Sequence, residues 1–343
     1  MRCCAIQFVF AVFCGFFGVL SPDGRSIADA QQSKADEATS SSTAIPIEAP
    51  TPKYQLRYRF KPNQLVYYDV VHKSTVFIKT EGSSETTKNE SSSRKHFRVV
   101  SVEADGSGLL ELSIDRVRMS VQFGDNDPST FDSQSDDPVP QPFVQVKQSV
   151  GVPQARIKVA PNGRLIKAQR LHQAASGAGQ LRGIPKTADD DPSHNFLIVF
   201  PEQDIGLGES WSERLVVRVR VSKSLLRPVT LLKKYELVSV EQNLATIRLK
   251  MSVLTPIRDT GIRAQLIQRT PSGTIVFDLK QGLIVSKTLS IDKREVGLFN
   301  EKSLMHAKSQ RSEKLVNPAT VNPATVAAKP AAPIGKRAAT EKQ

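Results

Sequence analysis

Alternation of apolar and polar residues is the feature that most constrains the fold of this chain. Tyr54, Leu56, Tyr58 and Phe60 are separated by single polar residues, and the same two-residue period continues through most of residues 54–306. A period of two sends successive side chains to opposite faces of a strand. We therefore expect an all-β fold, mainly antiparallel, whose sheet is curved, packed as a sandwich or rolled into a half-barrel.

Turn residues and one change of phase add local detail. Glycine-containing segments at 104–108 and at Asn162–Gly163 each separate two alternating runs, which predicts a hairpin at both places. Apolar residues occupy even positions up to Ile114 and odd positions from Val117. A change of phase inside one strand is typical of a β-bulge, which we place near Asp115–Arg116.

Some segments depart from the alternating pattern. We expect one or two short helices, near residues 165–175 and 299–307. Long polar segments at 80–93, 124–142 and 172–194 are predicted to be loops. The serine-rich composition of the first favours disorder.

The first 30 residues have the features of a secretory signal peptide. A basic start at Arg2 is followed by an apolar run and by the small-residue site Ala28-Asp29-Ala30, which predicts cleavage between Ala30 and Gln31. An uncleaved membrane anchor is the alternative, but the apolar run is shorter than the roughly 20 residues that a spanning helix needs. We expect an exported protein, periplasmic or extracellular, without a membrane span after cleavage.

Composition divides the rest of the chain. Residues 31–53 are predicted to be a disordered linker, and 307–343, with two N-P-A-T-V repeats, a disordered basic tail. Between them, 54–306 forms the β-rich domain, either as one unit or as two lobes with a boundary near 172–195. The net charge of +13 divides into +5 on the tail, +9 on this domain and −1 on the linker.

The three cysteines all precede residue 15, which excludes a disulfide scaffold and a cysteine-ligated metal site in the domain. Gly208–Ser212 lacks the final glycine of a nucleophile elbow. Asp125-Asn126-Asp127 lacks the glycine and glutamate of a calcium loop. The sequence therefore predicts no metal and no cofactor, and it favours a protein that is not an enzyme.

The five histidines show no metal-ligand spacing. His72 shares a strand face with Val66, Tyr68 and Val70, which indicates a packed core residue rather than a catalytic base. A hydrolase with dispersed catalytic residues is a less favoured alternative function. It would require a serine or a carboxylate beside His72, His96 or His194 in a cleft.

A row of basic residues is the one candidate site. In the strand that follows Trp211, the odd positions are apolar, and Arg214, Arg218 and Arg220 occupy even positions, with Lys234 nearby. The arginines should therefore point away from the core and could pair with carboxylate or phosphate groups. The alternative is a solubilising outer face. No nucleic-acid partner is expected, because the basic residues lack interleaved aromatic residues and the chain is predicted to be exported.

Three phrases resemble a known group of proteins. They are L-R-Y-R-F-K-P-N-Q-L-V-Y-Y-D-V at 56–70, F-P-E-Q-D-I-G-L-G-E-S-W at 200–211 and G-T-I-V-F-D-L-K-Q-G-L-I-V-S at 273–286. The chain resembles exported bacterial β-rich proteins of unassigned function, over most of 54–306. The last phrase is also similar to a strand–turn–strand unit of periplasmic half-barrels that carry lipids or lipoproteins. This likeness concerns the fold and implies no catalytic residues.

Our leading hypothesis is a secreted or periplasmic, non-enzymatic protein that binds an anionic or amphipathic envelope component, such as an acidic polymer or a lipid. The main alternative is a periplasmic carrier of a lipid or another hydrophobic ligand, held in an apolar pocket of the curved sheet. The sequence does not indicate an oligomeric state.

Overall fold

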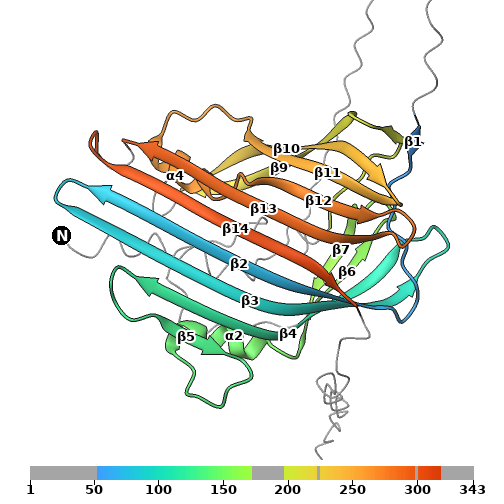
Figure 1. Ribbon diagram of the computed structural model, residues 1–343, viewed down its shortest axis with the longest axis horizontal. Helices are drawn as coiled ribbons and strands as arrows, with labels where there is room; N and C mark the ends of the chain where they lie inside the picture. The colour runs from blue at the N-terminus through green and yellow to red at the C-terminus, as the bar shows by residue number, and fades with distance from the viewer. Residues whose placement is uncertain (1–51, 172–196, 222–224, 298–299, 318–343) are drawn as a thin grey trace, which may run out of the picture.

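Figure 1 shows the computed structural model, which describes residues 52–171, 197–221, 225–297 and 300–317. These ranges contain fourteen strands and three short helical segments. The strands are β1 (Lys53–Tyr54), β2 (Leu65–Thr80), β3 (Ser83–Val102), β4 (Gly108–Phe123), β5 (Ser129–Asp132), β6 (Pro153–Val159), β7 (Leu165–Arg170), β8 (Ile205–Gly206), β9 (Ser210–Arg220), β10 (Leu226–Glu241), β11 (Leu244–Val253), β12 (Ser272–Asp278), β13 (Leu283–Val296) and β14 (Leu304–Val316). The helical segments are η2 (Gln141–Phe143), α2 (Val144–Ser149) and α4 (Thr260–Ile267).

Twelve strands form one antiparallel sheet. Its order is β7-β6-β4-β3-β2-β14-β13-β12-β11-β10-β9, and β5 pairs with β4. The last strand in sequence, β14, lies in the middle of the sheet between β2 and β13. Among the described strands, those at the ends of the order, β7 and β9, do not pair, so the sheet is curved but not closed (Figure 1). The predicted all-β, mainly antiparallel fold is confirmed.

The predicted hairpins and bulge are also present. β3 and β4 are joined across 104–108, and β6 and β7 across Asn162–Gly163. Gly163 has a φ of +86°, and a Cβ there would lie 2.2 Å from the Ile198 carbonyl oxygen, so only glycine fits this turn. Between β3 and β4, Asp115 is an extra residue, because Arg116 and Ile114 pair with consecutive residues of β3.

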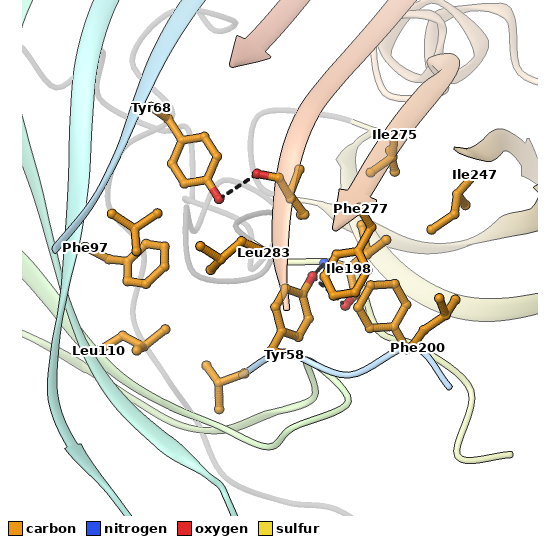
Figure 2. Close-up of a cluster of buried hydrophobic side chains, with 14 of the residues drawn as sticks. Tyr58, Tyr68, Phe97, Leu110, Ile198, Phe200, Ile247, Ile275, Phe277 and Leu283 are labelled. Atoms are coloured by element: carbon orange, nitrogen blue, oxygen red, sulfur yellow. Dashed lines mark hydrogen bonds between the residues drawn. The ribbon is translucent and has the colours of Figure 1, made fainter. Parts of the chain in front are cut away.

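The core lies on one face of the sheet, which we call the inner face. One buried cluster contains Phe97 and Leu110 from β3 and β4 together with Ile247 and Ile275 from β11 and β12. These strand pairs are far apart in the sheet order, so they share a cluster only because the sheet curls round it. Figure 2 shows Tyr58 between the two halves. The inner face is therefore concave.

Two segments outside the large sheet, one with Tyr58 and the other with Phe200, pack against its concave face. Tyr58 and Phe200 have ring centroids 5.0 Å apart, and Tyr58 lies 5.4 Å from the ring of Phe277 on β12. The Tyr58 hydroxyl accepts a hydrogen bond from the Ile198 N–H at 3.1 Å and donates one to the Ile198 carbonyl at 3.2 Å (Figure 2). Burial raises the pKa of Tyr58 well above its usual value.

The short helices cover other parts of the inner face. α4 starts where the Asp259 carboxylate accepts a hydrogen bond from the Ile262 N–H at 2.8 Å. Its buried residues pack against β9 and β10 and, in a second cluster, against β2, β13 and β14. On the opposite half of the sheet, Phe143 at the end of η2 packs with Val117 and Met119 of β4.

Two predictions of disorder are wrong in the described residues. Residues 80–93 are mostly strand, because β2 and β3 continue through them and turn at Gly82, where φ is +82°. Pairing with β2 and β4 satisfies this serine-rich backbone, and Thr87 is only 1% exposed. The tail was predicted to start at residue 307, but residues 307–316 belong to β14. This strand is held by backbone pairing with β13 on one side and β2 on the other.

One or two short helices were expected, and the described residues contain the two short α-helices α2 and α4, but the predicted positions are wrong. Residues 165–170 form β7, and 304–307 belong to β14. The expected loop at 124–142 contains β5, which pairs with β4. The period of a short apolar segment does not distinguish a strand from a helix. Residues 165–170 form a strand because the turn at Gly163 pairs them with β6.

Several predictions fall outside the described residues. They are the signal peptide at 1–30 with its cleavage site between Ala30 and Gln31, most of the linker at 31–53, the segment 172–195 and the tail from 318. Lys53, at the end of the predicted linker, belongs to β1. Strands from both sides of 172–195 belong to the same sheet.

Candidate functional site

The inner face changes from apolar to polar along the central strands. On β2, the inner positions after Val70 are His72 and Ser74, while β14 places Arg311 opposite His72. On the other side of β2, His72 pairs with Ser91 of β3. The prediction that His72 shares a face with the apolar residues of β2 is confirmed, but its cross-strand neighbours are polar.

Four charged side chains meet on this part of the inner face. We call Lys95 of β3, Lys287 of β13 and Arg311 and Glu313 of β14 the inner charged cluster. The Glu313 carboxylate lies 3.2 Å from Lys95 Nζ through Oε1 and 3.2 Å from Lys287 Nζ through Oε2. Arg311 donates from Nη2 to Glu313 Oε1 at 2.8 Å. One carboxylate is therefore within ion-pair distance of three cations.

The cluster is buried on one side and accessible on the other. The side chains of Glu313 and Lys287 are 5% and 7% exposed, and that of Lys95 is 19% exposed. The Arg311 side chain is 49% exposed. Solvent therefore reaches the inner face at Arg311 but hardly reaches the carboxylate behind it.

Burial and mutual interaction shift the pKa values in the cluster. Burial lowers the pKa of Lys95 to about 8, Glu313 opposes this shift, and Lys287 and Arg311 add to it. Burial also lowers the pKa of Lys287. For Glu313, burial alone would raise the pKa, but the three cations outweigh it and hold the pKa well below its usual range. Glu313 is therefore ionised at neutral pH.

Tyr68 and His72 lie close to the inner charged cluster, and neither carries a charge at pH 7. Lys95 Nζ lies 5.8 Å from the centre of the Tyr68 ring, and the Tyr68 hydroxyl donates to the Ile284 carbonyl at 3.0 Å. Burial, with a smaller contribution from Arg311, lowers the pKa of His72 to about 4, so His72 is neutral at pH 7. Farther round the sheet, Lys233 of β10 pairs with Glu213 of β9 at 3.6 Å.

Buried apolar clusters flank the inner charged cluster. Tyr68, the cross-strand partner of Lys95, belongs to the core cluster of Figure 2. Along β13, Ile291 lies two inner positions beyond Lys287 and packs with α4. On the other half of the sheet, Met119 of β4 pairs with Ser91 and belongs to the cluster covered by η2. These apolar side chains are buried, at 5%, 7% and 8% exposed, and the apolar residue beside the exposed Arg311 is its half-buried cross-strand partner Leu289.

The basic row predicted from the sequence lies elsewhere, on the outer face. Arg214 and Arg218 are exposed on β9, and Lys234 is exposed on β10, where it pairs with Ser212 beside Arg214. Val216, between the two arginines, is 55% exposed. Arg220 is half-buried at the end of β9, and its backbone is bonded to the side chain of Gln265 on α4. Three of the four predicted residues therefore share one exposed surface.

The histidines give little support to a hydrolase. His96 Nδ1 lies 2.7 Å from Asp115 Oδ1, so a carboxylate does lie beside one of the three candidate histidines. Both residues lie on the outer face at the bulge. A hollow of about 550 Å³ is lined by residues of β3, β2, β14 and β13. Neither His96 nor Asp115 lines it, and the four residues of the inner charged cluster do not line it either. His194 is outside the described residues.

No group of three potential metal ligands occurs in the described ranges. None of the helices described there is long and apolar enough to cross a membrane.

Sequence reasoning missed the inner charged cluster. Lys95 lies on the same face of its strand as the buried Phe97 and Val99, so the two-residue period indicated that its charge points inward. The partners were not readable, because Glu313 and Arg311 belong to the segment predicted to be a disordered tail.

The fold and the site define an open, curved β-sheet protein with charged groups on its concave face. No family model matches the chain, and no curated protein matches it either. A solved structure described as showing lipid–protein interactions in lipovitellin has 11% sequence identity, and the match covers 76% of this chain and 26% of that one with a TM-score of 0.43. This chain thus spans about a quarter of that chain's length.

A second solved structure is a DUF1329 family protein from Desulfovibrio piger. It has 10% identity, and the match covers 75% of this chain and 89% of that chain with a TM-score of 0.14. Both likenesses are loose and concern the fold alone.

Proposed function

We propose that this protein is an exported, non-enzymatic carrier that binds an amphipathic anion on the inner face of its sheet. The observation that carries the proposal is the inner charged cluster, in which Lys95, Lys287 and the half-exposed Arg311 share the Glu313 carboxylate between apolar clusters. An acidic headgroup would bind at Arg311, and the apolar part of the ligand would start at the half-buried Leu289, the cross-strand partner of Arg311.

The buried charges of the cluster are costly for folding. Removing an ion from water costs several kcal/mol even in real proteins, and a well-packed apolar substitute is often as stable or more stable. A cluster that served folding alone would therefore be expensive. A ligand headgroup adds acceptors for the cations, and each methylene group that it buries contributes about 0.8 kcal/mol. The buried cations are therefore better explained by ligand binding than by a contribution to folding stability.

Lipid binding can be measured directly. Native mass spectrometry of the mature protein should show a co-purified amphiphile, and a fluorescent fatty acid should bind in a saturable way. Arg311→Gln should weaken that binding about tenfold, since a charge-assisted hydrogen bond is lost. Arg248→Gln is a matched control, because the Arg248 side chain is 47% exposed on the outer face and also pairs with a carboxylate. Absence of any bound amphiphile, or equal binding by both variants, would refute the proposal.

A second candidate function uses the outer face. Arg214, Arg218 and Lys234 lie on one exposed surface around the exposed Val216. We propose that this surface holds the protein against an anionic envelope component, either a lipid surface or an acidic polymer. The two functions are compatible, since the residues of one lie on the opposite face from the residues of the other.

A further inference from the structure

Exposed apolar residues lie among the cations at the β9 end of the sheet. On the outer face of β9, Val216 lies between Arg214 and Arg218 and is 55% exposed. Its cross-strand partner Thr230 accepts a hydrogen bond from the Leu254 N–H at 2.8 Å, which places Leu254, 42% exposed, beside Thr230. We call Arg214, Val216, Arg218 and Leu254 the edge surface. Single exposed apolar residues are common on proteins, whereas a group of them marks a site of interaction.

The charge around the edge surface is of one sign. Residues 214–221, 225–234 and 252–258 contain arginines and lysines but no aspartate or glutamate. Lys233 pairs with Glu213, but this pair lies on the inner face. The edge surface is therefore cationic, which suits an anionic partner.

The end of the β9–β10 hairpin has the same composition. The Val221 N–H donates to the Leu225 carbonyl at 2.9 Å, so these two residues lie together where the strands end. They are 42% and 56% exposed, and Arg227 is exposed two residues farther on. Among the described strands β9 pairs with β10 alone, so the hairpin forms one rim of the sheet. A flat surface can contact such a rim, whereas it cannot enter the concave face.

We infer that the anionic envelope component bound by the outer face is a lipid surface, and that the edge surface contacts it. The inference rests on the second proposed function, which allows either a lipid surface or an acidic polymer. An acidic polymer would use the arginines and would gain nothing from Val216 and Leu254. A bilayer offers anionic headgroups to the cations and, just beneath them, an apolar region that accepts aliphatic side chains.

Vesicles and a polymer separate the two partners. The mature protein is mixed with vesicles of phosphatidylglycerol and phosphatidylcholine in equal parts, and separately with immobilised polyglutamate. Both should retain it at low salt. At about 0.5 M salt, which screens the cations, polyglutamate should release the protein, while the vesicles should keep part of it through the inserted apolar side chains.

Each outcome of this experiment has a distinct meaning. Release from vesicles and polymer at the same salt concentration would overturn the lipid surface and leave an anionic envelope component standing. Retention on neither at low salt would overturn the second proposed function itself.

A double variant links the salt-resistant binding to the edge surface. Val216→Ser/Leu254→Ser removes two apolar side chains and keeps every charge. Its affinity for the vesicles should fall about tenfold at high salt, because less apolar area leaves water, while its retention on polyglutamate should stay that of the parent. Val71→Ser/Val238→Ser is the matched control, since these valines are 43% and 37% exposed at other places on the sheet. Circular dichroism checks that both variants are folded, and an equal loss in both would contradict the assignment.

A fluorescent label locates the contact independently of these variants. Residues 15–343 contain no cysteine, so Val216→Cys gives the mature protein a single thiol. An environment-sensitive fluorophore on this thiol should shift its emission to the blue on the vesicles but not on polyglutamate. The same label on Val71→Cys should not shift with either. No shift at residue 216, or an equal shift at both positions, would overturn the edge surface as the lipid contact.

Discussion

The two faces of the sheet use charged residues in opposite ways. On the outer face, Lys73 pairs with Glu90 at 3.3 Å, and both side chains are about 60% exposed, at 62% and 60%. On the inner face, Glu313 is 5% exposed and is shared by three cations. The chemistry is the same on both faces, but the surroundings differ. Exposed pairs typically contribute about 0–1 kcal/mol, whereas removing one partner of a buried pair costs about 3–5 kcal/mol.

The difference shows why net charge alone says little about this protein. Most of the cations on the described strands are exposed, and ions in solution screen them. The few cations on the concave face interact through a medium of lower dielectric constant. Burial, rather than the number of charges, therefore identifies the candidate site.

The strongest test of this comparison is Glu313→Gln. The substitution leaves Lys95 and Lys287 buried without the carboxylate that they share, so the free energy of unfolding should fall by about 3–5 kcal/mol. Urea denaturation monitored by circular dichroism measures the loss.

Glu90→Gln is the matched change on the outer face. It removes one carboxylate from an exposed pair, and the free energy of unfolding should fall by less than about 0.5 kcal/mol. Similar losses for the two variants would mean that the inner charged cluster is hydrated like the surface.

Acid should reveal a second difference. The pKa of His72 is lowered to about 4 by burial and by Arg311, so the unfolded chain takes up a proton at higher pH than the folded protein does. His72 therefore contributes stability that is complete above about pH 6.5 and is lost as the pH falls towards 4. Between pH 7 and pH 5, His72→Gln should lose about 2 kcal/mol less than the parent protein.

His306→Gln is the comparison on the outer face. His306 lies 2.7 Å from Asp292, whose side chain is 60% exposed. The free energy of unfolding of the His306→Gln variant at pH 7 should lie within about 0.5 kcal/mol of the parent's, because it removes one partner of an exposed pair. If His72→Gln follows the parent curve, the histidine is better solvated than its position indicates.

The local features of the fold could be predicted from the sequence because they depend on neighbouring residues. The bulge at Asp115 follows from a change of phase within one strand, and the hairpin at Asn162–Gly163 follows from turn chemistry. The inward orientation of His72 follows from period two. None of these predictions requires knowledge of which strands pair.

The inner charged cluster could not be predicted in the same way. Its residues come from three segments of the chain, around 95, 287 and 311–313, and meet only because β14 pairs with both β2 and β13. Pairing between strands so distant in sequence leaves no local pattern. The basic composition of the last 37 residues also favoured a disordered tail, although their first ten are in a central strand.

A partly buried pair on the outer face gives an intermediate case. Arg94 donates to both oxygens of Asp69, at 2.8 and 2.7 Å, and its side chain is 18% exposed. Arg94→Gln should lower the free energy of unfolding by about 1 kcal/mol, more than an exposed pair and less than the cluster. Lys73→Gln serves as the exposed control. An Arg94 effect as large as that of Glu313→Gln would show that geometry outweighs burial.

The smallest effect on stability is expected from the exposed basic residues of β9. The double variant Arg214→Gln/Arg218→Gln should change the free energy of unfolding by less than about 0.5 kcal/mol, because both side chains face solvent. Its retention on anionic vesicles should nevertheless fall about threefold at low salt, and the difference should vanish near 0.5 M salt. Lys73→Gln/Lys88→Gln removes the same charge from two other exposed positions. An equal loss in both double variants would mean that the outer face attracts anions through total charge and has no specific surface on β9.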